Sequence, residues 1–332
     1  MRIYRHSGPL PPEARGAVAA IGNFDGVHLG HQAVIGETAA IAARTGHPRA
    51  VVTFEPHPRR YFKPDLPPFR LTPLRIKAHC IEALGVDHLF VLHFDKALAS
   101  LTPADFVAQV LAEGLATSHV VVGEDFIFGK ARAGNAAVLQ ELGDKHGFGV
   151  TALAPVKGPS GEVYSSTRIR DHLTSGRPAE AAALLGRVWE IEGRVVPGDA
   201  RGRDLGYPTA NIDIGEYLRP RQGIYAVCAG IDRGTETHWH DAVASFGTRP
   251  AIGGGPEVFE VHLLDHDEDL YGKHLRVGLV DYLRPESDFD SLDALRAAIA
   301  RDVDKARAVL AERAGTIRFA ERPGPGLDSA AS

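Results

Sequence analysis

Five short apolar runs recur through the first half of the chain, and segments with a helical pattern separate them. The runs are rich in Val, Ala, Leu and Phe, as expected of strands buried on both faces of a parallel sheet. They occupy residues 17–22, 50–54, 88–94, 119–123 and 149–153. The clearest intervening segments with apolar residues at spacings of three to four are 73–84, 103–115 and 135–146. This alternation predicts a doubly wound α/β domain over residues 1–185.

The pattern changes after Gly186, where strand-like runs follow one another with Gly, Pro and Asp between them. These runs lie at 188–196, 223–231, 240–247, 257–264 and 274–283. We therefore predict a C-terminal antiparallel β-barrel domain over residues 186–322. It includes a C-terminal helix over about residues 291–314, whose apolar stripe we expect to pack against the barrel. The stripe consists of Leu292, Leu295, Ile299, Val303, Ala306 and Leu310. Residues 323–332 are predicted to be a disordered tail.

The composition limits what the chain binds. Its formal net charge over 332 residues is -5, which argues against nucleic acid as a partner because an extended nucleic-acid surface needs a basic face. Small anionic molecules need only a local Arg or Lys cluster. Cys80 and Cys228 lack a Cys or His at metal-ligand spacing, so we expect two buried thiols. No segment resembles a signal peptide or a membrane span, which favours a cytoplasmic protein, and the sequence leaves the oligomeric state open.

The segment GNFDGVHLGH, residues 22–31, directly follows the first predicted strand. A helix is expected to begin near Gly30, so His28 and His31 lie on one face of the turn into it. Backbone N–H groups and the positive end of the helix dipole point to the same region, and Gly26 and Gly30 permit close approach of a ligand. We interpret the segment as a cradle for a nucleotide phosphate. The alternative is that both histidines are ordinary surface or capping residues.

Three further segments follow in order, TFEPHPR at 53–59, VGEDFIFGKARAGN at 122–135 and YSSTRIR at 164–170. With residues 22–31 they resemble the nucleotidylyltransferase superfamily, and within it the FMN adenylyltransferase module of bacterial bifunctional riboflavin kinase/FAD synthetases. The resemblance implies a nucleotidylyltransferase-like fold and in-line attack of an FMN phosphate oxygen on the α-phosphorus of ATP, with pyrophosphate leaving. It also implies that His28 and His31 are catalytic by stabilising charge, assisted by Mg2+.

The same resemblance assigns substrate contacts in the first half of the chain. The ATP-binding residues that it implies are Gly22, Asn23, Phe24, Gly30, Ser165, Ser166, Thr167 and Arg168. Arg168 and Arg170 supply positive charge for a triphosphate, and the alternative is a hydroxyl-capped helix with solvated arginines. Asp125, Phe126 and Phe128 are the implied flavin-binding residues, although two aromatics at a strand end are equally consistent with core packing.

The segment GRVVPGDARGRDLGYPTANI, residues 193–212, places several glycines ahead of a Thr and an Asn. A Gly-rich backbone with an Arg can surround a polyphosphate, and hydroxyl and amide oxygens suit magnesium. A turn-rich connection between strands is the alternative. The segment resembles the riboflavin kinase signature, and the likeness continues through residues 223–227, 260–265, 270–273 and 283–295. It implies an ATP site at Gly198, Gly202, Arg203, Gly206 and Pro208, with Mg2+ at Thr209 and Asn211.

Glu260 matches the position of the catalytic base of the riboflavin kinase family, which implies that it takes the proton from the ribityl hydroxyl of riboflavin. The sequence leaves open which strand face it occupies, and an exposed strand residue is the alternative. Departures from the family at Ala251, His266 and Asn135 put individual loop contacts in question. The predicted function is the conversion of riboflavin to FMN and of FMN to FAD with ATP. A nucleotidylyltransferase for another phosphorylated substrate and a non-catalytic flavin-binding sensor are the alternatives.

Overall fold

The computed structural model describes residues 1–5, 10–159, 161–197, 206–233, 236–248 and 257–320. The chain divides into two compact units. The N-terminal unit contains residues 1–67 and 74–165, and the barrel unit contains residues 68–73 and the chain from Ser166 onward. The tail predicted for residues 323–332 lies outside the described residues.

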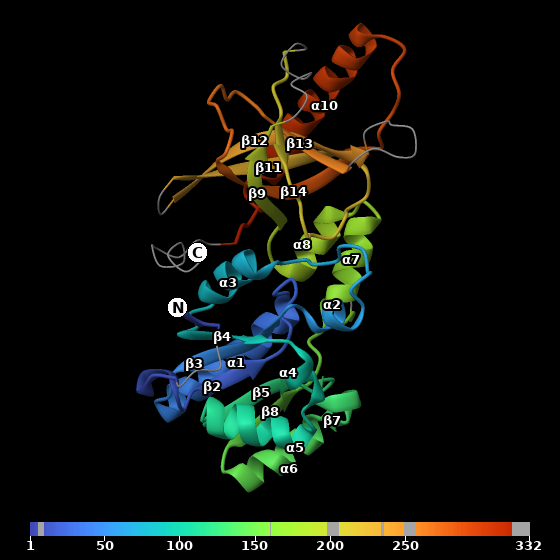
Figure 1. Ribbon diagram of the computed structural model, residues 1–332. Coiled ribbons are helices and arrows are strands. Elements are labelled where there is room, and N and C mark those ends of the chain that lie inside the picture. Colours follow the sequence, from blue (N-terminus) through green and yellow to red (C-terminus); the bar gives the residue numbers. More distant parts are fainter. Residues whose placement is uncertain (6–9, 160, 198–205, 234–235, 249–256, 321–332) are drawn as a thin grey trace. The chain divides into compact units, whose positions relative to one another are not determined.

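A six-stranded parallel sheet forms the centre of the N-terminal unit (Figure 1). All five predicted strands are present, and one additional strand, β1, pairs with β4. In spatial order the strands are β1 (Arg2–Tyr4), β4 (His88–His93), β3 (Arg49–Glu55), β2 (Val18–Ile21), β5 (His119–Gly123) and β8 (Gly149–Leu153). Strand β1 has three residues and none of them is fully buried, so a search for apolar runs does not find this edge strand.

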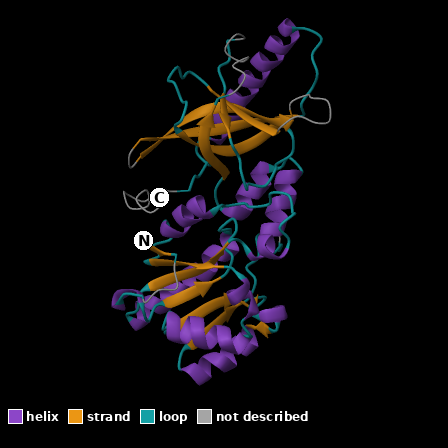
Figure 2. Cartoon of the chain, viewed as in Figure 1, coloured by secondary structure: helices purple, strands orange, loops and turns teal. Residues whose placement is uncertain are grey.

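Helices cover both faces of this sheet, as the doubly wound prediction requires (Figure 2). On one face Val18 and Val121 pack against α1. On the other face Ala19 and Val120 pack against a π-helix and α6. The helices are α1 (Leu29–Thr45), α2 (Pro58–Phe62), α3 (Leu74–Glu82), α4 (Lys96–Ser100), α5 (Pro103–Asp105), the π-helix (Phe106–Gly114) and α6 (Ala136–His146), with 3-10 turns at Pro12–Ala14 and Lys130–Arg132. A small hairpin joins β6 (Ile127–Phe128) to β7 (Gly134–Asn135).

The barrel unit contains a closed antiparallel barrel, as predicted. The five predicted strands are joined by a sixth, the short strand β10, which pairs with β13 and β9. In spatial order the strands are β10 (Ala210–Ile212), β13 (Glu257–Leu263), β12 (Glu236–Thr248), β11 (Gly223–Arg233), β14 (His274–Arg284) and β9 (Trp189–Val196). Strand β10 has only three residues and follows a turn-rich segment, which explains why its apolar content gives little signal.

Helix α10 (Leu292–Arg313) packs against β11, β12 and β14. The predicted stripe is right for Ala306 and Leu310, which are buried, but wrong for Leu292, which is 65% exposed. The buried face includes Asp302 instead. Its carboxylate accepts a hydrogen bond of 2.7 Å from Nη2 of Arg284, and this charge-assisted pair makes burial of the carboxylate tolerable.

Residues 166–185 lie in the barrel unit, so the compact units do not divide at residue 185. These residues form α7 (Ser166–Thr174) and α8 (Pro178–Leu185), and α8 packs against β9 and β14. Residues 68–73 also belong to the barrel unit, because two hydrogen bonds attach them to it. Nε1 of Trp189 donates to the carbonyl of Leu71 at 2.8 Å. The backbone N–H of Leu218 donates to the carbonyl of Arg70, also at 2.8 Å. Backbone docking of this kind leaves no pattern of apolar spacing in the sequence.

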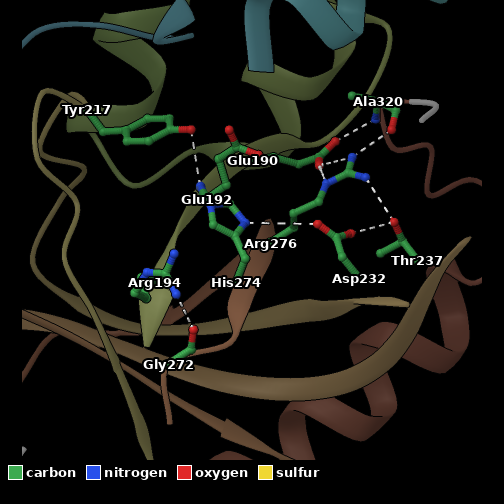
Figure 3. A network of polar contacts seen from close by, with 10 residues as sticks. All are labelled: Glu190, Glu192, Arg194, Tyr217, Asp232, Thr237, Gly272, His274, Arg276 and Ala320. Atoms are coloured by element: carbon green, nitrogen blue, oxygen red, sulfur yellow. Dashed lines mark hydrogen bonds and ion pairs between the residues drawn. The ribbon is translucent and has the colours of Figure 1, made fainter. Parts of the chain in front are cut away.

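A buried polar network joins the segment after α10 to the barrel (Figure 3). Arg276 on β14 is 1% exposed, and its Nε donates to Oε2 of Glu190 on β9 at 2.9 Å. Its Nη2 donates to the carbonyl of Ala320 at 2.6 Å, and its Nη1 donates to Oγ1 of Thr237 at 3.2 Å. The guanidinium therefore has partners on three segments, as the burial of a charge requires.

Cys80 and Cys228 are buried thiols with no disulfide, as predicted. Burial raises the pKa of the Cys228 thiol to about 12, so the thiol stays protonated at neutral pH. Among the helices of the described residues, none is long and apolar enough to cross a membrane.

Candidate active sites

The order of strands in the parallel sheet reverses beside β2. The chain proceeds from β2 to β3 and β4 on one side, and to β5 and β8 on the other. In open α/β sheets, ligands bind at the carboxyl ends of the strands where the order reverses. Residues 22–31 leave β2 at this point. The sheet therefore places the predicted phosphate cradle where this fold ordinarily binds a ligand.

His28 and His31 lie together at the first turn of α1. His28 is the N-cap residue, and its Nδ1 accepts a hydrogen bond of 3.3 Å from the backbone N–H of His31. The two rings stack with centroids 3.6 Å apart and an angle of 18° between their planes. Because Nδ1 of His28 is an acceptor here, a neutral His28 carries its proton on Nε2. The capping alternative is thus correct for His28, and it fixes the ring beside the helix N-terminus where an anion is favoured.

The turn that carries the histidines has an unusual backbone. Phe24 and Val27 have positive φ angles of 47° and 43°, and Gly26 has a φ of 94°. A positive φ in a residue other than glycine costs about 1–3 kcal/mol and persists only when the surrounding structure holds it. Phe24 is buried, and its ring meets that of His31 edge-on with centroids 5.2 Å apart. The strained turn therefore places a buried ring against His31.

Parts of three predicted motifs meet at this turn. The hydroxyl of Thr53, from TFEPHPR, donates to the carbonyl of Asn23 at 3.2 Å. Tyr164, from YSSTRIR, lies against Gly30, where an added Cβ would be 3.4 Å from the Cβ of Tyr164. The same Cβ would be 3.2 Å from Nδ1 of His28, which is a tight contact, so any side chain at residue 30 would press on the His28 ring.

Lys77 also belongs to this region, although the sequence analysis did not single it out. Its Nζ donates to Oγ1 of Thr53 and to Oε1 of Glu55, each at 3.3 Å. The signal was a lysine among the buried positions of a predicted helix, next to Ile76. Such a lysine is unusual enough to mark a polar site, because buried lysines are rare unless paired.

The structure separates the predicted flavin-binding aromatics. Phe128 is 8% exposed and packs in the core against Phe106, with ring centroids 5.6 Å apart. Phe126 is half-buried and stacks on Phe128, with centroids 5.5 Å apart. Core packing accounts for Phe128, whereas Phe126 and the exposed Asp125 remain accessible to a ligand. Asn135 caps α6 by accepting from the backbone N–H of Val138 at 3.0 Å, as an aspartate could, so this departure from the family keeps the cap.

An exposed aromatic residue at the carboxyl edge of the sheet was missed. Phe62 at the end of α2 is 64% exposed, and its ring meets those of Tyr61 and Phe94 edge-on at 5.2 and 5.7 Å. Phe94 directly follows β4. A large exposed ring held by two others suits contact with a flat ligand. The sequence sign of this residue was the pair Tyr61–Phe62 shortly after TFEPHPR. That pair belongs to none of the periodic patterns, so it was not noticed.

The hydroxyl and arginine motif lies where the chain passes between the two units. Ser165 is the last residue of the N-terminal unit, and Ser166, Thr167 and Arg168 form the first turn of α7 in the barrel unit. Arg170 is not a solvated arginine, because its Nε donates to the carbonyl of Phe69 at 2.9 Å. The structure thus gives Arg170 a role in holding residues 68–73.

The candidate kinase residues share one face of the barrel wall. Asn211 on β10 pairs directly with Glu260 on β13, and Glu260 pairs on its other side with Ser245 on β12. Directly paired residues project from the same face of a sheet, with Cβ atoms about 4.5–5.5 Å apart. Thr209 and Asn211 are half-buried, whereas Ala210 between them is buried. Glu260 is therefore on the accessible outer face, which answers the question that the sequence left open.

The turn before β10 is attached to β13. Nδ1 of His262 lies 2.8 Å from the carbonyl of Pro208, and its ring meets Tyr207 edge-on with centroids 5.4 Å apart. Gly206 has a φ of 85°, which a glycine adopts readily. Thr209 is thereby held next to the Glu260 face. Gly198, Gly202, Arg203 and Ala251 lie outside the described residues.

Glu286, just beyond β14, is a second carboxylate near Glu260. Burial raises the pKa of Glu286, and the charge of Glu260 adds to this effect while Arg284 opposes it. The carboxylate covers Gly247, where an added Cβ would come within 2.0 Å of it. The sequence signal was its place in LRPESDFDSLDAL, a segment that was recognised without a role for this residue.

The two residues that the sequence analysis assigns to a metal in the barrel, Thr209 and Asn211, offer neutral oxygens. Within the described residues no group of three or more His, Cys, Asp and Glu side chains could hold a metal ion. Thr209 and Asn211 offer a hydroxyl and an amide oxygen on one face, which fits Mg2+ that keeps its remaining ligands from water and nucleotide phosphates. Such a site depends on bound nucleotide, because two neutral ligands alone give little affinity.

Two family models match this chain, one over each candidate site. Residues 10–168 match the family model described as FAD synthetase, and residues 185–310 match that described as riboflavin kinase. A solved structure titled as a macrolide-efflux protein from Streptococcus pneumoniae has the same fold. Its TM-score is 0.82 at 30% identity, covering 92% of this chain and 98% of that one.

Curated relatives match over nearly the whole chain. A protein named bifunctional riboflavin kinase/FMN adenylyltransferase from Pseudomonas fluorescens is 42% identical over 315 residues, which is 95% of this chain and 99% of the relative. The protein of the same name from Escherichia coli K12 is 40% identical over 292 residues, covering 88% of this chain and 92% of the relative. This chain belongs to the bifunctional riboflavin kinase/FMN adenylyltransferase family.

Proposed function

We propose that the barrel unit phosphorylates riboflavin to FMN and that the N-terminal unit adenylylates FMN to FAD, each with ATP. The observation that carries the second activity is the stacked pair His28 and His31 at the N-terminus of α1, at the reversal point of the sheet. The first activity rests on the direct pairing of Asn211 with Glu260. As functional modules we assign residues 1–185 to the adenylyltransferase and 186–322 to the kinase.

In adenylyl transfer, a phosphate oxygen of FMN forms a bond to the α-phosphorus of ATP as the bond to pyrophosphate breaks. No protein nucleophile is needed, so the residues act by positioning and by stabilising charge. His28 and His31 donate to phosphate oxygens that gain charge, together with N–H groups at the start of α1. Ser165, Ser166, Thr167 and Arg168 bind the leaving pyrophosphate. Asp125, Phe126 and Phe62 face the flavin, and Phe128 supports Phe126 from the core.

In the kinase reaction, Glu260 accepts the proton of the ribityl hydroxyl as its oxygen attacks the γ-phosphorus of ATP and ADP leaves. Thr209 and Asn211 would hold Mg2+ together with the nucleotide, and the metal would neutralise phosphate charge. Gly206 and Pro208 shape the turn beside the nucleotide, and His262 holds that turn to β13. The other predicted ATP-binding residues, Gly198, Gly202 and Arg203, complete the proposed site.

The test compares two variants of the full chain by chromatographic separation of the flavins. His31→Ala should lower FAD formation from FMN by about a hundredfold or more, because one donor to the developing charge is lost. FMN formation from riboflavin should persist. Glu260→Gln should lower FMN formation by about a hundredfold, the range expected for a general base, while supplied FMN is still adenylylated.

A matched control comes from the same strand as Glu260. Glu257→Gln removes an exposed carboxylate that pairs with Arg219, and both activities should stay near the wild-type values. Loss of both activities in a correctly folded His31→Ala or Glu260→Gln variant would contradict two separate sites. Wild-type protein that forms neither flavin product would overturn the proposed function.

A further inference from the structure

Lys77 carries a charge into the interior of the N-terminal unit. Its side chain is 0% exposed, and its ammonium group donates to Thr53 and Glu55 on β3. Burial of an ammonium group is unfavourable unless its protons are satisfied, and an apolar residue is often as stable at such a position. Stability of the fold alone therefore gives little reason for a lysine here.

The hydroxyl of Thr53 connects Lys77 to the turn after β2. Oγ1 of Thr53 accepts from Nζ of Lys77 at 3.3 Å and donates to the carbonyl of Asn23 at 3.2 Å. A hydroxyl has one proton to donate, so the bond from Lys77 leaves that proton directed at Asn23. Hydrogen bonds in such a chain polarise one another in a medium of low dielectric constant. Thr53 is itself completely buried, which keeps water from competing.

The carbonyl of Asn23 is where the unusual backbone of the turn begins. Phe24 follows with a φ of 47°, a conformation that costs about 1–2 kcal/mol for a residue with a Cβ. Such a conformation persists only when surrounding contacts determine it. On the other side, the backbone N–H of Gly22 donates to the carbonyl of Val52 at 3.1 Å. Strand β3 thus holds both sides of Asn23, and Lys77 orients the hydroxyl that makes one of these contacts.

The position of Phe24 is transmitted to the histidines. Its ring packs edge-on against His31, which in turn stacks on His28. A displacement of about 1 Å in a catalytic group can lower a rate by about a hundredfold. A change at Lys77 therefore reaches the phosphate-binding rings through Thr53, Asn23 and Phe24, without any contact between Lys77 and the substrate.

We propose that Lys77 is a positioning residue for adenylyl transfer, which acts through the Thr53 hydroxyl to hold the turn of residues 22–31 in its active conformation. This inference rests on the proposed roles of His28 and His31. The competing view is that Lys77 and Glu55 form a structural ion pair with no effect on the turn. The two views differ in which kinetic constant changes and in whether Lys77 and Thr53 act as one unit.

The experiment measures kcat and KM for FAD formation, together with riboflavin kinase activity and the thermal midpoint, in variants of the full chain. Lys77→Met should lower kcat by about 10- to 100-fold. KM for ATP and FMN should stay within about threefold, because the loss concerns stabilisation of the transition state. Thr53→Val, which removes the hydroxyl at nearly constant shape, should reproduce this pattern, and Thr53→Ser should restore most of kcat.

The double variant Lys77→Met/Thr53→Val decides whether the two residues form one chain of contacts. Its kcat should be no lower than that of whichever single variant has the lower kcat, because the effects of two changes within one network do not add. Fully multiplicative losses, an unchanged kcat in Thr53→Val, or equal losses in Thr53→Ser and Thr53→Val would each overturn the proposal. The Thr53 variants keep the test decisive if Lys77→Met fails to fold.

Two controls separate this inference from the proposed function. Riboflavin kinase activity in the same chain should stay within about twofold, and a parallel loss would indicate general misfolding. Lys145→Met, which removes an exposed lysine paired with Glu141 in α6, should leave both activities unchanged. FAD formation by the wild type tests the proposed function by itself, so failure of the Lys77 inference leaves that result intact.

Discussion

The two candidate sites are assembled in opposite ways. The phosphate-binding turn of the N-terminal unit consists of neighbours in sequence, residues 22–31, whose backbone includes positive φ angles at Phe24 and Val27. The kinase site gathers Thr209, Asn211 and Glu260 from strands far apart in sequence, through the regular pairing of β10 with β13. One site depends on a strained local conformation, and the other depends on the register of a closed barrel.

This contrast indicates how each site should fail. A strained turn is held by a few tight contacts, so one misplaced atom can disturb it while the fold survives. Sheet register is strongly specified where one face is buried, so the kinase residues should keep their places as long as the barrel is intact. The first site should thus be sensitive to local packing, and the second to the stability of the barrel.

The largest effect is expected where the barrel itself is weakened. Arg276→Met removes the guanidinium that pairs with Glu190 and donates to the carbonyl of Ala320 (Figure 3). Breaking a buried ion pair from one side destabilises by about 3–5 kcal/mol, because the remaining charge is left without its partner. Kinase activity should be lost at a lower temperature or denaturant concentration, which thermal inactivation of both activities would measure.

The matched control for Arg276 is Arg233→Met, also in the barrel. Arg233 forms an exposed pair with Glu268, and exposed pairs contribute about 0–1 kcal/mol. Its thermal inactivation should therefore lie close to that of the wild type. If Arg276→Met inactivated no earlier than Arg233→Met, the stability of the barrel would not depend on the buried network.

The next effect is expected at the turn, from a single side chain. A Cβ on Gly30 would lie 3.2 Å from the His28 ring and 3.4 Å from Tyr164, so Gly30→Val should displace the ring. FAD formation should fall by about a hundredfold with little change in stability, since misplacement of about 1 Å has that effect on a rate. Steady-state assays of FAD and FMN formation check this.

Helix α1 contains its own control for this prediction. Gly36→Val makes the same chemical change in the same helix, but a Cβ at Gly36 would have no atom within 4 Å. Its FAD formation should equal that of the wild type. Equal losses in Gly30→Val and Gly36→Val would mean that valine disturbs the helix in general, and the packing argument for His28 would be wrong.

The same contrast explains what the sequence could predict. Residues 22–31 were recognised because the whole site is contiguous and begins after a readable strand. The alternation of apolar and helical segments likewise predicted the parallel sheet, and the succession of strand-like runs after Gly186 predicted the barrel. In β13, the buried residues Phe259, Val261 and Leu263 alternate with Glu260, so its accessible face was readable once the strand was paired. The pairing of Glu260 with Asn211 required the register of β10, which three residues do not specify.

Contacts between distant segments were beyond the sequence patterns. Lys77 in α3 donates to Thr53 and Glu55 in β3. Neither residue spacing nor helix propensity predicts that these two elements make contact there. Residues 68–73 join the barrel unit through their backbone carbonyls, which accept from the side chains of Trp189 and Arg170 and from the backbone of Leu218. The side chains of residues 68–73 give no sign of these contacts. Both depend on tertiary geometry, in contrast to the local turn that could be read directly.

The smallest predicted effect concerns the two neighbouring carboxylates of the barrel site, Glu286 and Glu260. Keeping them together costs stability, as the backbone strain does in the turn. The pKa of Glu286 is raised by burial and by the charge of Glu260, so the folded state binds its proton more tightly than the unfolded state. The stabilisation from that proton is present below the ordinary pKa and is lost as the pH rises through the raised value. Glu286 is an exposed residue, so solvent screens much of this effect. Glu286→Gln should therefore have a thermal midpoint higher than the wild type by no more than about 1 °C near pH 7, and the difference should vanish in acid. Glu141→Gln should show the opposite sign, because Lys145 lowers the pKa of Glu141. A pH-independent difference for Glu286→Gln would contradict the idea that the kinase site holds two carboxylates together at the expense of stability.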